Sequence, residues 1–349
     1  MLIKPPMLKS GDHVACVSSS WGGPACFPDR YAAGKKQLEK AFDVKLIDMP
    51  HTCANAEEIY NHPEKRAADL MQAFADPKIK AIISSIGGDD SVRMIPYLDL
   101  DVIKNNPKIF MGYSDTTISH FACLTAGLRS FYGPAIMAGF GENGGLFPYM
   151  QESVRKTLFS SEPIGEIIAH QDGWTAEMLS WAEPENQNKK RPLNPSQGTK
   201  VIQGSGKASG HLIGGCVEVL EMLKGTPLWP SNDTWDGAIL FLEVSEDLPP
   251  VSQFIYFMRN YAATGVLERL TGIIMGRPPF SSDKLDQLET YDDALYKVVH
   301  HEAGLTNLPI MTQMDFGHTD PMFVIPFGAT GLINCDKNTF SILDSSVTA

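Results

Sequence analysis

Cysteine is scarce in this chain, and its spacing carries no motif. The six cysteines are scattered between Cys16 and Cys335, and no two of them form a C-x-x-C pair. This spacing argues against a zinc knuckle or a thioredoxin-type site. Buried free thiols in a reducing cytoplasm are the simplest interpretation. We therefore expect a cytoplasmic protein that uses neither a metal nor an organic cofactor.

The sequence also has no long apolar run and fewer basic than acidic residues. No apolar run approaches the roughly 20 residues that span a bilayer, and the first residues lack the apolar core of a signal peptide. The chain has 29 Lys+Arg against 41 Asp+Glu, a net charge of -12. Binding to nucleic acid polymers or anionic membranes depends on Lys and Arg, so neither is expected as a partner. A small anionic ligand in a locally positive pocket is still compatible with this balance.

What is present is typical of a globular protein. Hydrophobic residues make up 43% of the 349 residues and charged residues 20%. These fractions exclude a disordered or fibrous chain. At roughly 150 residues per domain, the length predicts two domains.

The first part of the chain alternates apolar strands with helical patterns. Such alternation predicts a Rossmann-like parallel sheet covered on both faces, and we assign it to a domain over residues 1–165. Ligands of such sheets bind beyond the carboxyl ends of the strands. Small-residue loops follow three of those ends, at 18–23, 87–91 and 112–117. The expected strands are 13–19, 44–47, 79–86 and 108–112, and the expected helices are 28–42, 63–75, 95–103 in part, and 115–126.

The middle of the chain differs from the first part in composition and periodicity. Residues 183–200 are polar, contain proline and show no periodicity, which is typical of a functional or disordered loop. We assign 166–199 to a connecting segment with a substrate loop, and 200–349 to a mixed α/β domain with a β-rich core. Its expected strands are 200–203, 207–213, 237–244, 272–276, 322–326 and 331–336, and its expected helices are 216–223, 251–264 and 285–301.

The sharpest chemical feature is the motif Gly112-Tyr-Ser114-Asp-Thr-Thr117. Ser114 stands between an expected strand and an expected helix, the setting of a nucleophile elbow, although the pattern departs from G-x-S-x-G. The alternative is a helix cap made by Ser114 or Asp115, which needs no catalysis.

A glycine pair follows another strand, in Ile86-Gly87-Gly88-Asp89-Asp90-Ser91. Adjacent glycines let backbone N–H groups approach a ligand closely, so Gly88 and Asp115 N–H are candidates for an oxyanion hole. An ordinary turn with Asp89 as a helix cap is the alternative.

A serine nucleophile needs a base and an acid that orients the base. His318 lies in a loop between apolar segments, and Glu243 is the only charge in an apolar strand, where a carboxylate is costly unless paired. A turn histidine and a solvent-facing strand end are the alternatives. His120 and His211 are weaker candidates for a base. Asp315, His318 and Asp320 suggest a metal site only faintly, since no other cluster supports it.

Taken together, these motifs resemble the S66 serine peptidases, a family with cytoplasmic LD-carboxypeptidases and microcin C immunity proteins. The resemblance rests on 86–98, 108–117, Phe131-Tyr-Gly-Pro134, 206–215, Phe241-Leu-Glu243 and Gly317-His-Thr-Asp320. It implies Ser114 as nucleophile, Glu243 as triad acid and His318 as base, with Gly88 and Asp115 as the backbone oxyanion hole. It also implies an active site between two domains, often in a homodimer.

The glycine-pair loop and the stretch 173–187 look more like the immunity branch. In that branch an aromatic residue stacks on the substrate's nucleobase, a part that Trp181 or Trp174 could play. Asp89 and Asp90, beside Gly87, could hold a substrate α-ammonium. We expect hydrolysis of an aminoacyl- or peptidyl-nucleotide amide. The alternatives are a murein LD-carboxypeptidase that releases terminal D-alanine, and a two-domain ligand-binding protein without turnover.

Overall fold

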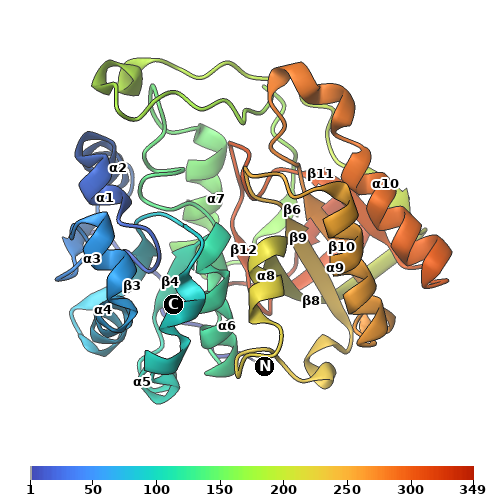
Figure 1. The fold of residues 1–349 in the computed structure, drawn as a ribbon, viewed down its shortest axis with the longest axis horizontal. Coiled ribbons are helices and arrows are strands. Elements are labelled where there is room, and N and C mark those ends of the chain that lie inside the picture. Colours follow the sequence, from blue (N-terminus) through green and yellow to red (C-terminus); the bar gives the residue numbers. More distant parts are fainter. Residues whose placement is uncertain (1) are drawn as a thin grey trace.

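The computed structural model describes residues 2–349 and contains two β-sheets. Figure 1 shows the first sheet with its helices in the blue and teal half of the molecule, and the second in the yellow to red half. The first sheet has the order β12-β5-β4-β3-β1-β2. Its strands are β1 His13–Val17, β2 Lys45–Asp48, β3 Ile79–Ser84, β4 Ile109–Gly112, β5 Phe131–Tyr132 and β12 Ile325–Pro326.

Strands β1 to β5 are mutually parallel, as the alternation of strands and helices predicts. The residues of β1, β3, β4 and β5 are almost entirely buried, because helices cover both faces of the sheet, whereas the edge strand β2 is half exposed. Proline at the first turn starts three of these helices, where the missing N–H costs nothing. The helices are α1 Gly23–Cys26, α2 Pro28–Phe42, α3 Ala56–Asn61, α4 Pro63–Ala75, α5 Leu100–Asn105, α6 Thr117–Thr125 and α7 Pro148–Leu158.

The second sheet has the order β6-β14-β13-β8-β9-β10-β11-β7. Its centre, from β8 to β11, is parallel, and the strands on either side are antiparallel, so the sheet is mixed as predicted. Helices α8 Val217–Leu223, α9 Val251–Ala263 and α10 Thr290–Tyr296 belong to this half. The strands are β6 Gly165–Ile167, β7 Lys200–Gln203, β8 Lys207–Cys216, β9 Ala238–Glu243, β10 Gly272–Gly276, β11 Ile310–Met314, β13 Thr330–Asn334 and β14 Thr339–Ile342.

Two expected elements of the second half are wrong in extent. The predicted strand 322–326 shrinks to β12, because the Phe323 and Val324 N–H groups donate to Asp315 O and Ser153 Oγ instead of to a strand. The predicted helix 285–301 breaks into a 3₁₀ turn at Ser282–Gln287, then α10, then a π-helical turn at Lys297–Glu302. Seven elements were not predicted from the sequence: α1, α3, α7, β5, β6, the fully buried strand β11, and β14.

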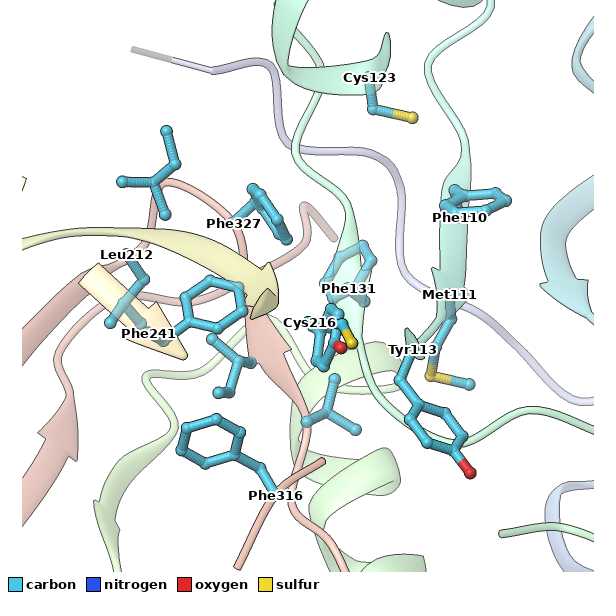
Figure 2. Packing of buried hydrophobic residues seen from close by; sticks show 14 of the residues in the cluster. Phe110, Met111, Tyr113, Cys123, Phe131, Leu212, Cys216, Phe241, Phe316 and Phe327 are labelled. Atoms are coloured by element: carbon cyan, nitrogen blue, oxygen red, sulfur yellow. The ribbon is translucent and has the colours of Figure 1, made fainter. Parts of the chain in front are cut away.

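The two sheets meet through a shared apolar core. Figure 2 shows Phe241 and Phe327 close to Phe131 and Cys216, with β4 and its Met111 beyond. Phe241 packs edge-on against Phe327 at 5.2 Å and Tyr132 at 5.4 Å between ring centroids. This packing joins β5 and the residue that follows β12, both of the first sheet, to β9 of the second.

The ends of β8 and α6 approach so closely that only glycine fits. A Cβ on Gly215 would lie 2.6 Å from the Thr117 side chain, and Gly215 has a φ of +150°. The next residue, Cys216, donates its N–H to Thr117 Oγ1 at 3.2 Å. The second sheet is therefore docked directly onto the turn that begins α6.

Candidate active site

Ser114 occupies the turn between β4 and α6 in a backbone conformation that is rare for a serine. Its φ is +63°, in the left-handed region, and a 3₁₀ turn over Ser114–Thr116 leads directly into α6. Thr117 Oγ1 donates to Ser114 O at 2.7 Å and fixes this turn. Non-glycine residues in this region carry local strain and cluster at functional sites. Ser114 is partly exposed, whereas the residues on either side of it are buried.

Glu243 and His318, which the sequence suggested as triad acid and base, lie in direct contact. Glu243 ends β9 and is fully buried, and its Oε2 lies 2.6 Å from His318 Nδ1. Gly317 makes this contact possible: its φ is +92°, and a Cβ there would lie 2.7 Å from Glu243 Cβ. The alternative of a solvent-facing strand end is excluded for Glu243 by its burial.

Tyr132 connects this pair to Ser114, a role that the sequence analysis did not assign. Its buried hydroxyl accepts the Ser114 N–H at 2.9 Å and donates to Glu243 Oε1. Both oxygens of the Glu243 carboxylate are thereby occupied, one by Tyr132 and one by His318. In the sequence, the only sign of this role was that Tyr132 ends a short apolar segment. The sheet order is needed to show that β5, which carries Tyr132, lies beside β4.

The charges around His318 favour its protonated form. Burial alone would lower the His318 pKa, but the Glu243 carboxylate, its hydrogen bond and the nearby Glu246 and Glu218 raise the pKa to about 9. Glu246 Oε2 lies 3.1 Å from His318 Nε2, the ring nitrogen opposite the one that Glu243 holds. Burial raises the pKa of Glu243 above its usual value, while His318 and Tyr132 oppose that rise.

This raised pKa predicts an alkaline pH profile. A general base must be neutral, so kcat/KM should rise about tenfold per pH unit up to the His318 pKa of about 9 and level off above it. The measurement is kcat/KM between about pH 6 and pH 10. A profile already flat above neutral pH would contradict His318 as the base in this environment.

The glycine-pair loop lies against Ser114. A Cβ on Gly87 would lie 2.9 Å from Ser114 Cβ, and one on Gly88, whose φ is +148°, would lie 2.2 Å from Ser20 Oγ. Asp115 fastens the two loops together, since its Oδ2 accepts the Ser91 N–H at 2.8 Å and its carbonyl accepts the Ser91 hydroxyl at 2.7 Å. Within residues 2–349, neither the Gly88 nor the Asp115 N–H donates to another protein group. Both amides are thus free to bind an oxygen beside Ser114.

Ser114 and His318 open onto a cavity of about 1070 Å³. Gly87, Gly88 and Asp89 line one wall, and residues 178–182 of the connecting segment form another. Trp181, Phe27 and Trp21 make an aromatic row, with ring centroids 5.7 Å and 5.9 Å apart. The structure therefore brings Trp181 and Asp89 to the same cavity as Ser114 and His318.

Trp174 and Asp90 do not line this cavity. Trp174 is only 2% exposed, and the Arg277 guanidinium lies 5.0 Å from its ring centroid. Asp90 is paired with Arg66 at 2.6 Å and with Arg93 at 2.8 Å. Their surroundings give both residues structural contacts in place of the substrate contact considered from the sequence.

The remaining histidine candidates are structural. His120 is fully buried and bonds to Ser130 Oγ at 2.8 Å and Gly112 O at 2.9 Å, and burial lowers its pKa to about 3. His211 Nε2 lies 2.8 Å from Thr234 O. Neither ring lines the cavity that contains Ser114.

The connecting segment that carries Trp181 is anchored to the rest of the protein by buried ion pairs. In Figure 1 it crosses the top of the view as a yellow-green strip between the two halves. Arg191 contacts Glu142, and it binds Asp320 Oδ2 at 2.7 Å, two residues beyond His318. The Arg30 guanidinium lies 4.9 Å from the Trp181 ring centroid. These contacts couple the cavity wall to the chain segment that carries His318.

Comparison with known families agrees with the fold. Residues 14–133 match the N-terminal domain of the LD-carboxypeptidase family S66, and residues 209–333 match its C-terminal domain. The chain belongs to this family of serine peptidases.

Among its relatives, the microcin C7 self-immunity protein MccF of Escherichia coli is 30% identical, covering 97% of this chain and 94% of that protein. A Vibrio cholerae relative that carries a carboxypeptidase name is 31% identical, covering 98% of both chains.

Solved structures of the family resemble this chain along almost its whole length. MccF in complex with aspartyl sulfamoyl adenosine has a TM-score of 0.86 at 28% identity, covering 99% of this chain and 100% of that one. An MccF-like protein from Streptococcus pneumoniae in complex with AMP has a TM-score of 0.85 at 27% identity, covering 96% of this chain and 99% of that one. The α/β fold with two sheets is thereby confirmed, and the chain is that of a hydrolase.

Proposed function

We propose that the chain is an amidase in which Ser114, Glu243 and His318 act as a catalytic triad. The observation that carries this proposal is the buried contact of 2.6 Å between Glu243 and His318, joined through Tyr132 to the Ser114 turn. Three groups far apart in the sequence are thereby linked, and two of them, Ser114 and His318, line the same cavity.

In the proposed reaction, His318 Nε2 takes the hydroxyl proton of Ser114 as Ser114 Oγ attacks the substrate's carbonyl carbon. The Gly88 and Asp115 N–H groups stabilise the oxyanion. When the C–N bond breaks, His318 donates its proton to the leaving nitrogen. Water, deprotonated by His318, then cleaves the acyl ester and restores Ser114. Glu243 stabilises the imidazolium in both halves.

We propose an aminoacyl- or peptidyl-nucleotide as the substrate, with removal of a microcin C-like toxin as the role. The aromatic row of Trp181, Phe27 and Trp21 offers flat apolar faces on which a nucleobase can stack. Relatives with the same fold have been solved with AMP and with aspartyl sulfamoyl adenosine. The cavity volume of about 1070 Å³ is ample for such a molecule.

Replacement of Trp181 tests this assignment. Trp181→Ala should lower kcat/KM for an aminoacyl sulfamoyl adenosine by about 5- to 150-fold, the worth of one base stacked on an aromatic ring, mainly through KM. Trp181→Phe should recover most of the loss. Steady-state kinetics on the nucleoside substrate and on a murein tetrapeptide are compared. An equal loss on both substrates would show that Trp181 only anchors its loop.

A murein LD-carboxypeptidase is the second candidate. The domain descriptions that match this chain are those of LD-carboxypeptidases, and relatives such as that from Vibrio cholerae carry carboxypeptidase names. Under this proposal the same triad releases the terminal D-alanine of a tetrapeptide. Incubation of wild-type protein with each substrate and mass analysis of the products distinguishes the two candidates.

We also propose that the chain acts as a homodimer in the cytoplasm, on the strength of the family resemblance. Over residues 2–349, no helix has the length and apolar character needed to cross a bilayer. Light scattering on the purified protein measures its mass in solution directly. A monomer at micromolar concentration would contradict the dimer.

A further inference from the structure

The ionisable side chains that line the active-site cavity are predominantly acidic. They are Asp89, Glu218, Glu246, Asp247 and His318, together with the phenol of Tyr113 and the thiol of Cys216, and none of the lining residues found among 2–349 is Lys or Arg. Glu243 adds a further carboxylate directly behind His318. Ligands that carry negative charge near these groups are therefore repelled, and positive charge is attracted.

The turn that carries the acidic residues beside His318 is anchored at its backbone. Glu218, on α8, accepts both the Ser245 N–H at 3.0 Å and the Ser245 hydroxyl at 2.5 Å. These bonds tie down the turn that follows β9 and carries Glu246 and Asp247. The turn thus presents its carboxylates to the cavity beside the end of β9.

Glu246 contacts the ring nitrogen of His318 that the proposed catalysis requires. Its Oε2 lies 3.1 Å from His318 Nε2, the nitrogen that must take the Ser114 proton, since Glu243 holds Nδ1. The Glu246 side chain is 73% exposed, so it is free to turn toward another partner in the cavity. A productive substrate must draw this carboxylate away from the imidazole.

We infer that Glu246, with Asp247 and Glu218 beside it, selects substrates whose acyl residue carries a positively charged side chain. This inference rests on the proposed amidase function. A lysine-like ammonium on the acyl residue would pair with Glu246, leave His318 Nε2 free for Ser114, and place its charge in the acidic part of the cavity. An aspartyl or glutamyl side chain would meet the same carboxylates and be repelled.

The shared chemistry is an amide with an ammonium-bearing acyl residue, and two sources supply it. One is a basic aminoacyl-nucleotide and the other is a peptide in which a diamino acid precedes D-alanine. The experiment uses both, as lysyl sulfamoyl adenosine and as L-Ala-D-Glu-L-Lys-D-Ala. In each arm, a matched substrate has norleucine in place of lysine, which keeps the four-carbon side chain and leaves the α-nitrogen as it is, but removes the side-chain ammonium. Aspartyl sulfamoyl adenosine completes the set.

For the wild-type protein, we expect kcat/KM for the lysyl substrate to exceed that for the norleucyl substrate by about tenfold, and that for the aspartyl substrate by about a hundredfold. Glu246→Gln should remove most of the lysyl preference. Its norleucyl activity near neutral pH should rise, because the His318 pKa falls. Glu268→Gln, an exposed carboxylate outside the cavity, should leave both values unchanged.

The possible results distinguish a failure of the charge selection from a failure of the amidase proposal. If Ser114-dependent hydrolysis occurs but lysyl and norleucyl substrates are cleaved equally, the charge selection is wrong and the amidase proposal stands. The selection is also wrong if Glu246→Gln keeps the wild-type lysyl preference. Absence of Ser114-dependent hydrolysis in both arms would overturn the amidase proposal itself.

Discussion

Ser114→Ala should lower kcat by about 10⁶ while leaving the protein folded. The substitution deletes one partly exposed oxygen, so the packing of the Ser114 turn is retained. What disappears is the covalent step, because none of the other proposed groups can replace the attacking oxygen. Single-turnover kinetics on the preferred substrate and the midpoint of thermal unfolding measure the two quantities separately.

Ser119→Ala is the matched control for this result. Ser119 lies on α6, the helix that follows Ser114, and its hydroxyl is buried without a hydrogen-bond partner within the described chain. Removing that oxygen should leave kcat within about twofold of wild type, because Ser119 does not line the cavity. Retention of more than about 1% of wild-type kcat by Ser114→Ala would contradict the nucleophile assignment.

Glu243→Gln should lower kcat by about 10⁴. The amide keeps the shape of the side chain but cannot stabilise the imidazolium, and it changes the orientation of His318. Because the Glu243 carboxylate raises the His318 pKa, the acid limb of the pH profile should also move to lower pH. Measurement of kcat over the full pH range separates these two effects.

Asp292→Asn provides the control for loss of a buried carboxylate. Asp292 is buried in the second half of the chain and accepts the Thr312 hydroxyl at 3.0 Å, but it does not line the cavity. Its loss should affect stability more than kcat. If Glu243→Gln were no more harmful to kcat than Asp292→Asn, Glu243 would be a structural residue only.

The first half of the fold was predictable because its elements are long and carry one clear periodicity. Helices α2 and α4 have the predicted bounds, 28–42 and 63–75. The short strand β12 was not predicted correctly, because tertiary hydrogen bonds at Val324 and Phe323 outweigh local preference. The predicted helix 285–301 was also wrong, since the structure divides it into a 3₁₀ turn, α10 and a π-helical turn.

The candidate triad could be proposed from the sequence because each member follows or precedes a recognisable apolar strand. Tyr132 and Glu246 could not, since their roles depend on neighbours more than 100 residues or 70 residues away, respectively. Trp174 and Trp181 looked equivalent in the sequence. Only the tertiary fold buries one against Arg277 and places the other in the cavity.

The most direct test of the account is labelling by a fluorophosphonate, which reacts with serines that a neighbouring base activates. Peptide mass analysis should find one adduct, on Ser114, in the wild-type protein. The adduct should be absent from Ser114→Ala and should form far more slowly in Glu243→Gln. An unlabelled wild-type protein, or an adduct on a different residue, would contradict Ser114 as a nucleophile activated by His318 and Glu243.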